Sequence, residues 1–172
     1  MAREPINLFS ARGTATQVRS LLLMWFPEAE VVGDADDWSE LLIRLDDGST
    51  LGFLHSAAYY TGPDWAKQKS DMQGYFLRFP LGDREAQTMA TIGTFQFSLG
   101  TRFEPDYDRA GDERLTILGK LAEVLDGVLF LPSSLRDPQG RILVSADGEV
   151  DPDAEWATIG EPDIYSDADV ST

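Results

Sequence analysis

Few side chains in this sequence are suited to chemistry near neutral pH. The chain contains a single histidine, His55, and no cysteine. Histidine is the side chain whose ordinary pKa lies closest to neutrality. Thiol catalysis, and a zinc or iron site built from several Cys or His ligands, would require residues that the sequence lacks. His55 is therefore the first candidate for a functional residue.

His55 begins a segment that is rich in aromatic residues. Tyr59, Tyr60 and Trp65 follow it, in a connection that the pattern places between a strand and a helix. Aromatic faces can stack on a ligand, and their polar tips can orient it. His55, Tyr59, Tyr60 and Trp65 are therefore the candidate residues for a ligand site, and such a site would make the protein a small-molecule-binding domain or a modest enzyme. The alternative interpretation is a packed aromatic loop, because no nucleophile or acid lies at a recognisable catalytic spacing.

Other catalytic and ligand-binding patterns are incomplete. A loop counted from Asp106 matches part of a calcium-binding loop, but Ala110 and Ile117 stand where oxygen ligands are needed. Ser133 and Ser134 lack the flanking glycines of a nucleophile elbow. Neither a phosphate-binding loop nor a dinucleotide fingerprint occurs. We therefore predict no metal and no cofactor, and a non-enzymatic protein is favoured over an enzyme.

The net charge of the chain bears on its partners. There are 30 Asp and Glu residues against 14 Lys and Arg, which gives a formal charge of -16. The basic residues are scattered, which argues against binding to nucleic acid or to an anionic membrane. The acidity can serve a basic protein partner, divalent cations or solubility alone. The leading hypothesis is a protein-binding module with a basic partner, similar in character to inhibitor or immunity proteins.

Length and composition fit a single folded domain in the cytoplasm. The 172 residues are 42% hydrophobic, which is typical of a globular domain. The absence of cysteine favours a reducing compartment. No signal-peptide pattern begins the sequence, and the most apolar short run, residues 21–26, is too short to span a bilayer. We expect a folded domain over residues 1–158 and an acidic, mobile tail over residues 159–172.

The spacing of apolar residues predicts an α+β fold with a mainly antiparallel sheet and helices packed against it. We expect helices over residues 14–26, 64–79, 83–90 and 112–125, and strands over residues 30–32, 41–45, 50–55, 94–99, 128–131 and 141–144. Asp64, Asp83 and Asp112 are predicted N-caps. Gly127 is predicted to be the first residue after the last helix.

The strand over residues 94–99 also bears on oligomeric state. Phe95, Phe97 and Leu99 alternate with polar residues along it. If this strand lay at an edge of the sheet with that face exposed, a homodimer would be favoured. The sequence leaves open which strand forms the edge.

A partial resemblance covers residues 121–143. The stretches LAEVLDGVLF (121–130) and SLRDPQGRIL (134–143) resemble the closing segment of several uncharacterised bacterial domain families. The resemblance implies a bacterial origin. It implies no activity and no site residue, because helix-glycine-strand-turn-strand endings recur widely.

Overall fold

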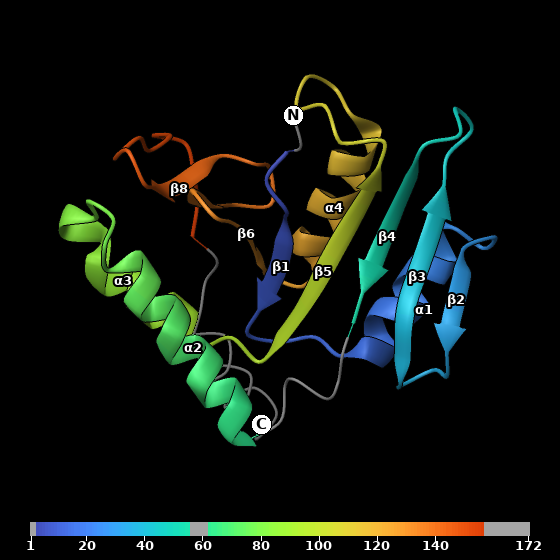
Figure 1. Ribbon diagram of the computed structural model, residues 1–172, viewed down its shortest axis with the longest axis horizontal. Helices are drawn as coiled ribbons and strands as arrows, with labels where there is room; N and C mark the ends of the chain where they lie inside the picture. Colours follow the sequence, from blue (N-terminus) through green and yellow to red (C-terminus); the bar gives the residue numbers. More distant parts are fainter. Residues whose placement is uncertain (1–2, 56–61, 157–172) are drawn as a thin grey trace, which may run out of the picture.

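The computed structural model describes residues 3–55 and 62–156, which form one antiparallel sheet covered by helices (Figure 1). The strands are β1 (Asn7–Ser10), β2 (Glu30–Gly33), β3 (Trp38–Arg44), β4 (Thr50–Leu54), β5 (Phe97–Glu104), β6 (Val128–Leu131), β7 (Ser134–Arg136) and β8 (Ile142–Ser145). The helices are α1 (Ala15–Trp25), α2 (Gly62–Phe76), α3 (Glu85–Gly93) and α4 (Glu113–Val124), with a short 3₁₀ helix at Gly82–Arg84. The predicted α+β fold with a mainly antiparallel sheet is confirmed.

Strands β1 and β5 form the centre of the sheet. The strand order is β2-β3-β4-β5-β1-β6-β7-β8, and every neighbouring pair is antiparallel. Leu8 of β1 lies opposite Leu99 of β5. Each of these two strands is followed along the chain by a helix and then by three strands. The two halves of the chain therefore share one order of elements, and α2 and α3 connect them.

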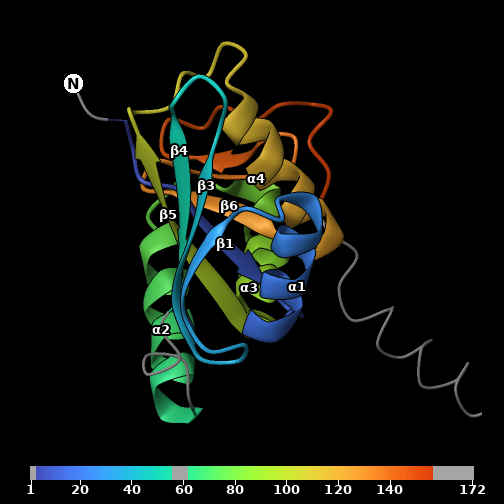
Figure 2. The same cartoon turned by 90° about the vertical axis from the view of Figure 1, so that its right-hand side faces the viewer.

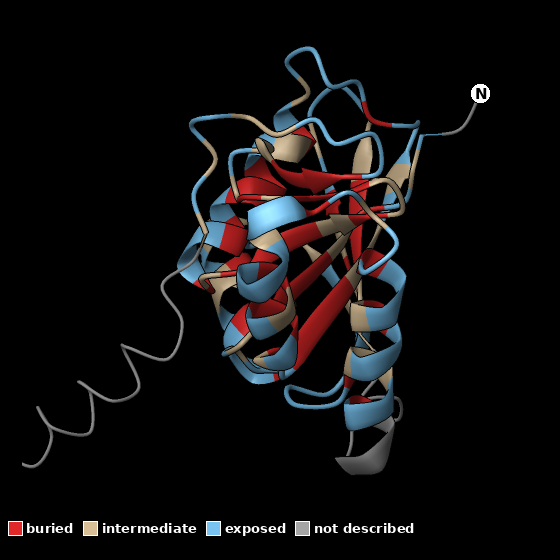
Figure 3. Cartoon of the chain, turned by 90° about the vertical axis from the view of Figure 1, so that its left-hand side faces the viewer, coloured by how far each residue is buried: buried red, intermediate tan, exposed pale blue. Residues whose placement is uncertain are grey.

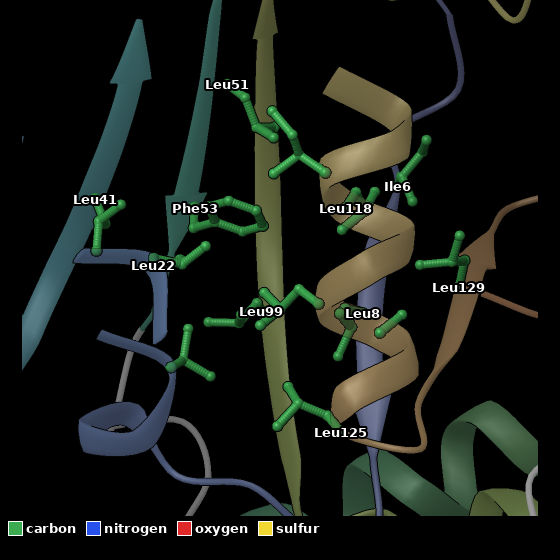
Figure 4. Packing of buried hydrophobic residues seen from close by; sticks show 14 of the residues in the cluster. Ile6, Leu8, Leu22, Leu41, Leu51, Phe53, Leu99, Leu118, Leu125 and Leu129 are labelled. Atoms are coloured by element: carbon green, nitrogen blue, oxygen red, sulfur yellow. The ribbon is translucent and has the colours of Figure 1, made fainter. Parts of the chain in front are cut away.

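Helices α1 and α4 cover one face of the sheet. Figure 2 shows them on one side of the sheet and α2 on the other. Leucines of both helices, including Leu22 and Leu118, pack against side chains from the strands such as Leu8, Phe53 and Leu129 (Figure 4). Each of these side chains is almost fully buried. Burial of such side chains contributes about 1.5–3 kcal/mol each, so this cluster is the main core of the domain.

The opposite face carries a second, smaller core. Phe76 of α2 and Ile92 of α3 pack there with Phe9, Val128 and Val144 from the strands. Successive residues of a strand point to opposite faces, which is why Leu8 belongs to the first core and Phe9 to the second. Figure 3 shows the buried residues on the strands and the exposed residues on the outer sides of the helices.

Of the three predicted helix caps, one is confirmed and two are wrong. Asp112 caps α4 as predicted, because its carboxylate accepts a hydrogen bond from the backbone N–H of Arg114 at 2.9 Å. The prediction for Asp64 is wrong, since α2 begins at Gly62. Asp83 does not cap α3 either: it lies in the preceding 3₁₀ helix, and Arg84 occupies the cap position without a side-chain bond. The backbone at Arg84 and Glu85 is already helical, so the start of α3 lacks the extended residue that an N-cap requires.

The end of α4 differs from the prediction by one position. Asp126, with φ of 50°, takes the left-handed conformation expected of Gly127. The N–H of Gly127 donates to the carbonyl of Ala122 at 2.8 Å, and that of Asp126 donates to Glu123 at 3.2 Å. These two bonds define a Schellman motif in which Gly127 is the second residue after the cap. A Cβ at Gly127 would lie 2.9 Å from the carbonyl oxygen of Phe9, so close packing requires this glycine.

The strand predicted as a possible dimer edge, β5, lies inside the sheet. β5 begins at Phe97, three residues later than expected, and runs to Glu104 between β4 and β1. Phe95, Phe97 and Leu99 are buried in the two cores. They therefore offer no exposed face for a homodimer.

The end of the chain is attached to the body as far as it is described. Trp156 and Ala154 pack against the second core. The backbone N–H of Glu155 donates to the carboxylate of Asp137 at 3.1 Å. The tail predicted over residues 159–172 lies outside the described residues. Among the described helices, none combines the length and the apolar character that crossing a bilayer requires.

Candidate functional site

The structure places the two described residues of the predicted aromatic site in different cores. The ring of His55 lies 5.4 Å from that of Trp38 and 5.6 Å from that of Phe97, both of the α1/α4 core. Trp65 belongs to the second core, where its ring stacks on Phe9 at 6.4 Å. The sheet therefore separates the packing partners of His55 from those of Trp65.

The other half of that prediction is outside what the structure describes. Tyr59 and Tyr60 fall within residues 56–61. The backbone N–H of His55 donates to Ser39 at 3.0 Å, while its buried Nδ1 has no hydrogen-bond partner among the described residues. A ligand site formed by His55, Tyr59, Tyr60 and Trp65 stays a prediction.

A groove at one end of the sheet is formed by three segments that are far apart in the sequence. They are the end of α1 with the start of β2 (residues 25–30), the turn between β3 and β4 (residues 42–49) and the connection from β5 into α4 (residues 105–114). The turn and the connection lie at the same end of the sheet, the upper end in Figure 1. The hollow has a volume of about 1500 Å³. We call it the acidic groove because of the residues that line it.

Carboxylates dominate the lining of the acidic groove. The lining contains eight acidic side chains and two arginines, Arg44 and Arg114. The acids are Glu28, Glu30, Asp46, Asp47, Asp106, Asp108, Asp112 and Glu113. All of them except Asp112 are exposed to solvent. The groove therefore concentrates negative charge from three segments on one concave surface.

Most of these carboxylates lack a positive partner in the described chain. Glu30 pairs with Arg44 at 3.4 Å, and Asp112 pairs with Arg114 at 2.8 Å. None of the other six forms an ion pair with a described residue. Like charges that share a hollow repel one another, so a bound cation would relieve this repulsion.

Local hydrogen bonds keep part of this charge in place. Asp47 accepts hydrogen bonds from both the hydroxyl and the backbone N–H of Ser49, at 2.6 and 2.9 Å. The pKa of Asp47 lies below its ordinary value, first because of the bond from the Ser49 hydroxyl. Asp108 accepts the N–H of Ala110 at 3.0 Å. The bonds from Ser49 favour the ionised carboxylate of Asp47, and the bond to Asp108 holds its side chain in a fixed position.

Arg114 holds one wall of the groove. Its side chain is almost fully buried and forms two bonds to the carboxylate of Asp112, Nε to Oδ1 at 3.1 Å and Nη2 to Oδ2 at 2.8 Å. Nη1 also donates to the carbonyls of Thr50 and Pro105, at 2.9 and 2.7 Å. One guanidinium thereby ties the connection after β5 to the start of β4, which fixes the position of the acidic residues around it.

An apolar wall lies beside the acids. Trp25 and Phe26, at the end of α1, are half-buried and line the groove. The ammonium group of Lys120 lies 4.5 Å from the centre of the Trp25 ring. Such a cation over an indole face is a favourable contact. The groove thus combines dense negative charge with aromatic surface.

The acids of the groove are arranged for a broad contact. Among the described residues, no group of three or more His, Asp or Glu side chains is close enough together to hold a metal ion. Carboxylates distributed along a groove can instead each meet a separate cationic side chain.

Two of the acids after β8, Asp147 and Asp151, are engaged within the fold. Asp147 accepts a hydrogen bond from the Ser145 hydroxyl at 2.7 Å and one from the N–H of Glu149 at 3.0 Å. Asp151 accepts the N–H of Ile142 at 2.7 Å. Carboxylates that accept hydrogen bonds within the fold in this way are part of the domain's own structure. The acidic groove is therefore the stronger candidate for an external contact.

The sequence contains the parts of the groove but no sign of their proximity. The Asp46–Asp47 turn and the polar connection before Asp112 are both visible as local patterns. Their proximity depends on β4 pairing with β5, which places Thr50 opposite Glu104. A pairing between strands that are far apart in the chain has no local sequence signal, so sequence reasoning missed the groove.

Comparison with known proteins identifies no relative. No family model, no curated protein and no solved structure matches the chain. The resemblance of residues 121–143 to uncharacterised bacterial families therefore stays a prediction.

Proposed function

We propose that this protein is a non-enzymatic binding module whose partner is a protein with a basic surface, and that the partner binds at the acidic groove. The observation that carries the proposal is the set of six exposed carboxylates that line one hollow without a positive partner among the described residues. The overall charge of -16 adds a long-range attraction of the same sign.

The lining defines the chemistry of the partner. Lysine or arginine side chains would meet the carboxylates of the β3–β4 turn and of the connection after β5. An apolar or aromatic side chain next to them would pack on Trp25 and Phe26. Arginine and aromatic residues are the groups that most often dominate binding energy at protein interfaces. Charge complementarity predicts fast association and strong dependence on salt.

The test compares three forms of the full chain as baits in one pull-down. The groove variant D46N/D106N/E113Q neutralises three acids whose side chains form no hydrogen bond or ion pair with a described residue. The control variant D83N/E85Q/D153N removes the same charge from exposed positions outside the groove. Both variants have the same net charge. Any difference in partner binding between them therefore shows whether the partner binds at the acidic groove.

The proposal predicts a basic protein that is retained by the wild type and by the control variant but not by the groove variant. That protein should be released between about 50 and 300 mM salt, because the screening length falls from about 14 Å to about 6 Å over this range. A partner that is retained equally by both variants would contradict binding at the groove. A partner that is unaffected by salt would contradict the electrostatic basis.

A further inference from the structure

A second cavity lies against the acidic groove and has a different character. It has a volume of about 950 Å³ and opens between α4, the connection after β5, and strands β6 and β7. Gly111 and Asp112 line both hollows, so the connection after β5 is a shared wall. Its volume is in the range of cavities that hold small molecules, about 300–1000 Å³.

The floor of this cavity is apolar. Ile6, which directly precedes β1, and Leu129 and Leu131 of β6 lie on the face that α4 covers, and each is buried. The packing of α4 on residues 137–140 closes one side. Gly119 permits this contact, because a Cβ there would lie 2.3 Å from the carbonyl oxygen of Pro138. A ligand in the cavity would therefore lie on a hydrocarbon surface.

Arg136 of β7 brings a positive charge to that floor. Its register partner is Leu129, so the guanidinium lies on the same face as the leucine. Nε donates to the Ser134 hydroxyl at 3.1 Å and Nη1 donates to the Gly140 carbonyl at 2.8 Å. These two bonds fix the orientation of the half-buried guanidinium, yet Arg136 forms no ion pair with a described residue.

A second arginine lies at the same cavity. Arg109 lines it from the connection after β5 and stacks over the Tyr107 ring, 5.9 Å from the ring centre. Glu4 is its acidic partner at 4.0 Å, a long contact, and Glu4 also accepts a hydrogen bond from Ser133. The pKa of Arg136 lies below its ordinary value, first because of burial and second because of the positive charge of Arg109.

Basic side chains outnumber acidic ones in the cavity lining, with Arg109, Lys120 and Arg136 against Asp112 and Glu123, although the chain has a net charge of -16. The half-buried guanidinium of Arg136 has no ion-pair partner among the described residues, so an anionic ligand would add a favourable interaction there. Arginine is suited to such a role, because its planar donors bind both oxygens of a carboxylate or phosphate. The two arginines that line the cavity suit an anionic group, and the leucines on its floor suit a hydrocarbon chain.

We propose that this cavity binds a small amphiphilic organic anion, with its oxyanion on Arg136 and Arg109 and its hydrocarbon part on Ile6, Leu129 and Leu131. The anionic group is a carboxylate or a phosphate monoester, which present the same oxygen acceptors to a guanidinium. This site is distinct from the acidic groove and does not depend on the proposed protein partner.

The experiment titrates the full chain with three probes of equal chain length, namely hexanoate, hexyl phosphate and 1-hexanol, and follows backbone amide shifts by NMR. We expect both anions to shift the amides around the cavity, among them those of Gly119, Leu129 and Gly140. The neutral alcohol should bind at least about tenfold more weakly, which corresponds to the loss of about 1.4 kcal/mol of interaction with the arginines.

Variants locate the site. R136Q should weaken binding of the anions about tenfold or more, R136K should restore part of it, and R109Q should weaken it less, because Arg109 is more exposed. R102Q is the matched control, since Arg102 pairs with Glu40 at 3.2 Å and does not line the cavity. If R136Q fails to fold, the test uses the affinity of R109Q for the anions together with the comparison of 1-hexanol with the anions in the wild type.

Three results would overturn the proposal. One is the absence of any shift up to about 10 mM of either anion, since binding weaker than this corresponds to less than about 3 kcal/mol. Another is equal affinity for 1-hexanol and the anions. The third is unchanged affinity in R109Q and R136Q. The groove variant D46N/D106N/E113Q should bind hexanoate as the wild type does, which separates this test from that of the proposed function.

Discussion

Asp112 and Arg114, two residues apart at the start of α4, form a bidentate ion pair that is almost fully buried. The same Asp112 carboxylate caps the helix, and the same Arg114 guanidinium reaches the carbonyls of Thr50 and Pro105. Because Asp112 lines both the acidic groove and the neighbouring cavity, this pair positions the wall that the two candidate sites share.

Removal of one partner of this pair should be costly. We expect Arg114→Met to destabilise the fold by about 3–5 kcal/mol, because it leaves a carboxylate and three backbone carbonyls without their buried donor. Urea unfolding followed by tryptophan fluorescence measures the loss. Arg44→Met is the matched control, since Arg44 and Glu30 are both exposed, and it should cost about 1 kcal/mol or less. Equal losses in the two variants would contradict the assigned role of Arg114.

The pair should also give the stability a specific dependence on pH. The pKa of Asp112 lies below its ordinary value of 3.8, first because of the hydrogen bond from Arg114. In the unfolded chain that pKa returns to its ordinary value, so the unfolded state takes up the proton first as pH falls. The contribution is therefore complete well above pH 4 and is lost as the pH falls through the pKa of the folded state.

Asp112→Asn tests this contribution, because asparagine still caps a helix but cannot titrate. We expect the difference in unfolding free energy between wild type and variant to be constant from pH 5 to pH 7, since this range lies above the ordinary aspartate pKa of 3.8. The difference should shrink toward pH 3. A difference that stays constant over the whole range would contradict a stabilising contribution from the ionised carboxylate of Asp112.

Two helical glycines should respond in opposite directions to the same substitution. Gly74 of α2 is exposed, and no heavy atom outside its own helix lies within 4 Å of the place that a Cβ would take. Gly74→Ala should therefore stabilise the protein by about 0.5–1 kcal/mol through helix propensity. Gly119→Ala should destabilise it by at least about 1–3 kcal/mol, because the added methyl would collide with the Pro138 carbonyl. Thermal unfolding of both variants gives the signs. Stabilisation by Gly119→Ala would mean that residues 137–140 do not pack directly on α4.

Asp137 is a structural acid in a chain with many exposed ones. Its side chain is fully buried and accepts bonds from the N–H groups of Gln139, Arg141 and Glu155 and from the Arg141 guanidinium. We expect Asp137→Ala to destabilise the fold by about 2–4 kcal/mol, since the buried donors would lose their acceptor.

The exposed acid Asp153 provides the control for that measurement. Asp153→Ala should change the unfolding free energy by no more than about 0.5 kcal/mol. If both substitutions cost equally little in urea unfolding, the carboxylate of Asp137 does not organise the turn after β7.

Much of the fold could be predicted from local pattern. The α1 and α4 helices and the β3–β4 hairpin have strong periodicity and clear terminal signals, with Asp112 capping α4. The central strand β1 (Asn7–Ser10) was missed because it has only two apolar residues, Leu8 and Phe9, and neither is β-branched. Its strand structure depends on pairing with β5 and β6. β7 was missed for the same reason, since Leu135 is its only apolar residue.

The candidate sites could be predicted far less well. The aromatic segment from His55 to Trp65 is continuous in sequence, yet His55 and Trp65 pack in cores on opposite faces of the sheet. The acidic groove and the arginines of the neighbouring cavity come from segments that only the strand order brings together. Charge and composition led to the hypothesis of a basic partner, whereas the proposed location of its binding site required knowledge of the long-range strand pairing.

The most direct test of the proposed function is an amide NMR titration of the full chain with octalysine at about 50 mM salt, where charges interact over about 14 Å. Binding of a basic partner at the acidic groove predicts the largest shifts at the β3–β4 turn and the connection after β5, around Gly48 and Gly111. Those shifts should be lost in D46N/D106N/E113Q and kept in D83N/E85Q/D153N. Shifts that spread evenly over the acidic surface, or that persist unchanged in the groove variant, would contradict a basic partner at the acidic groove.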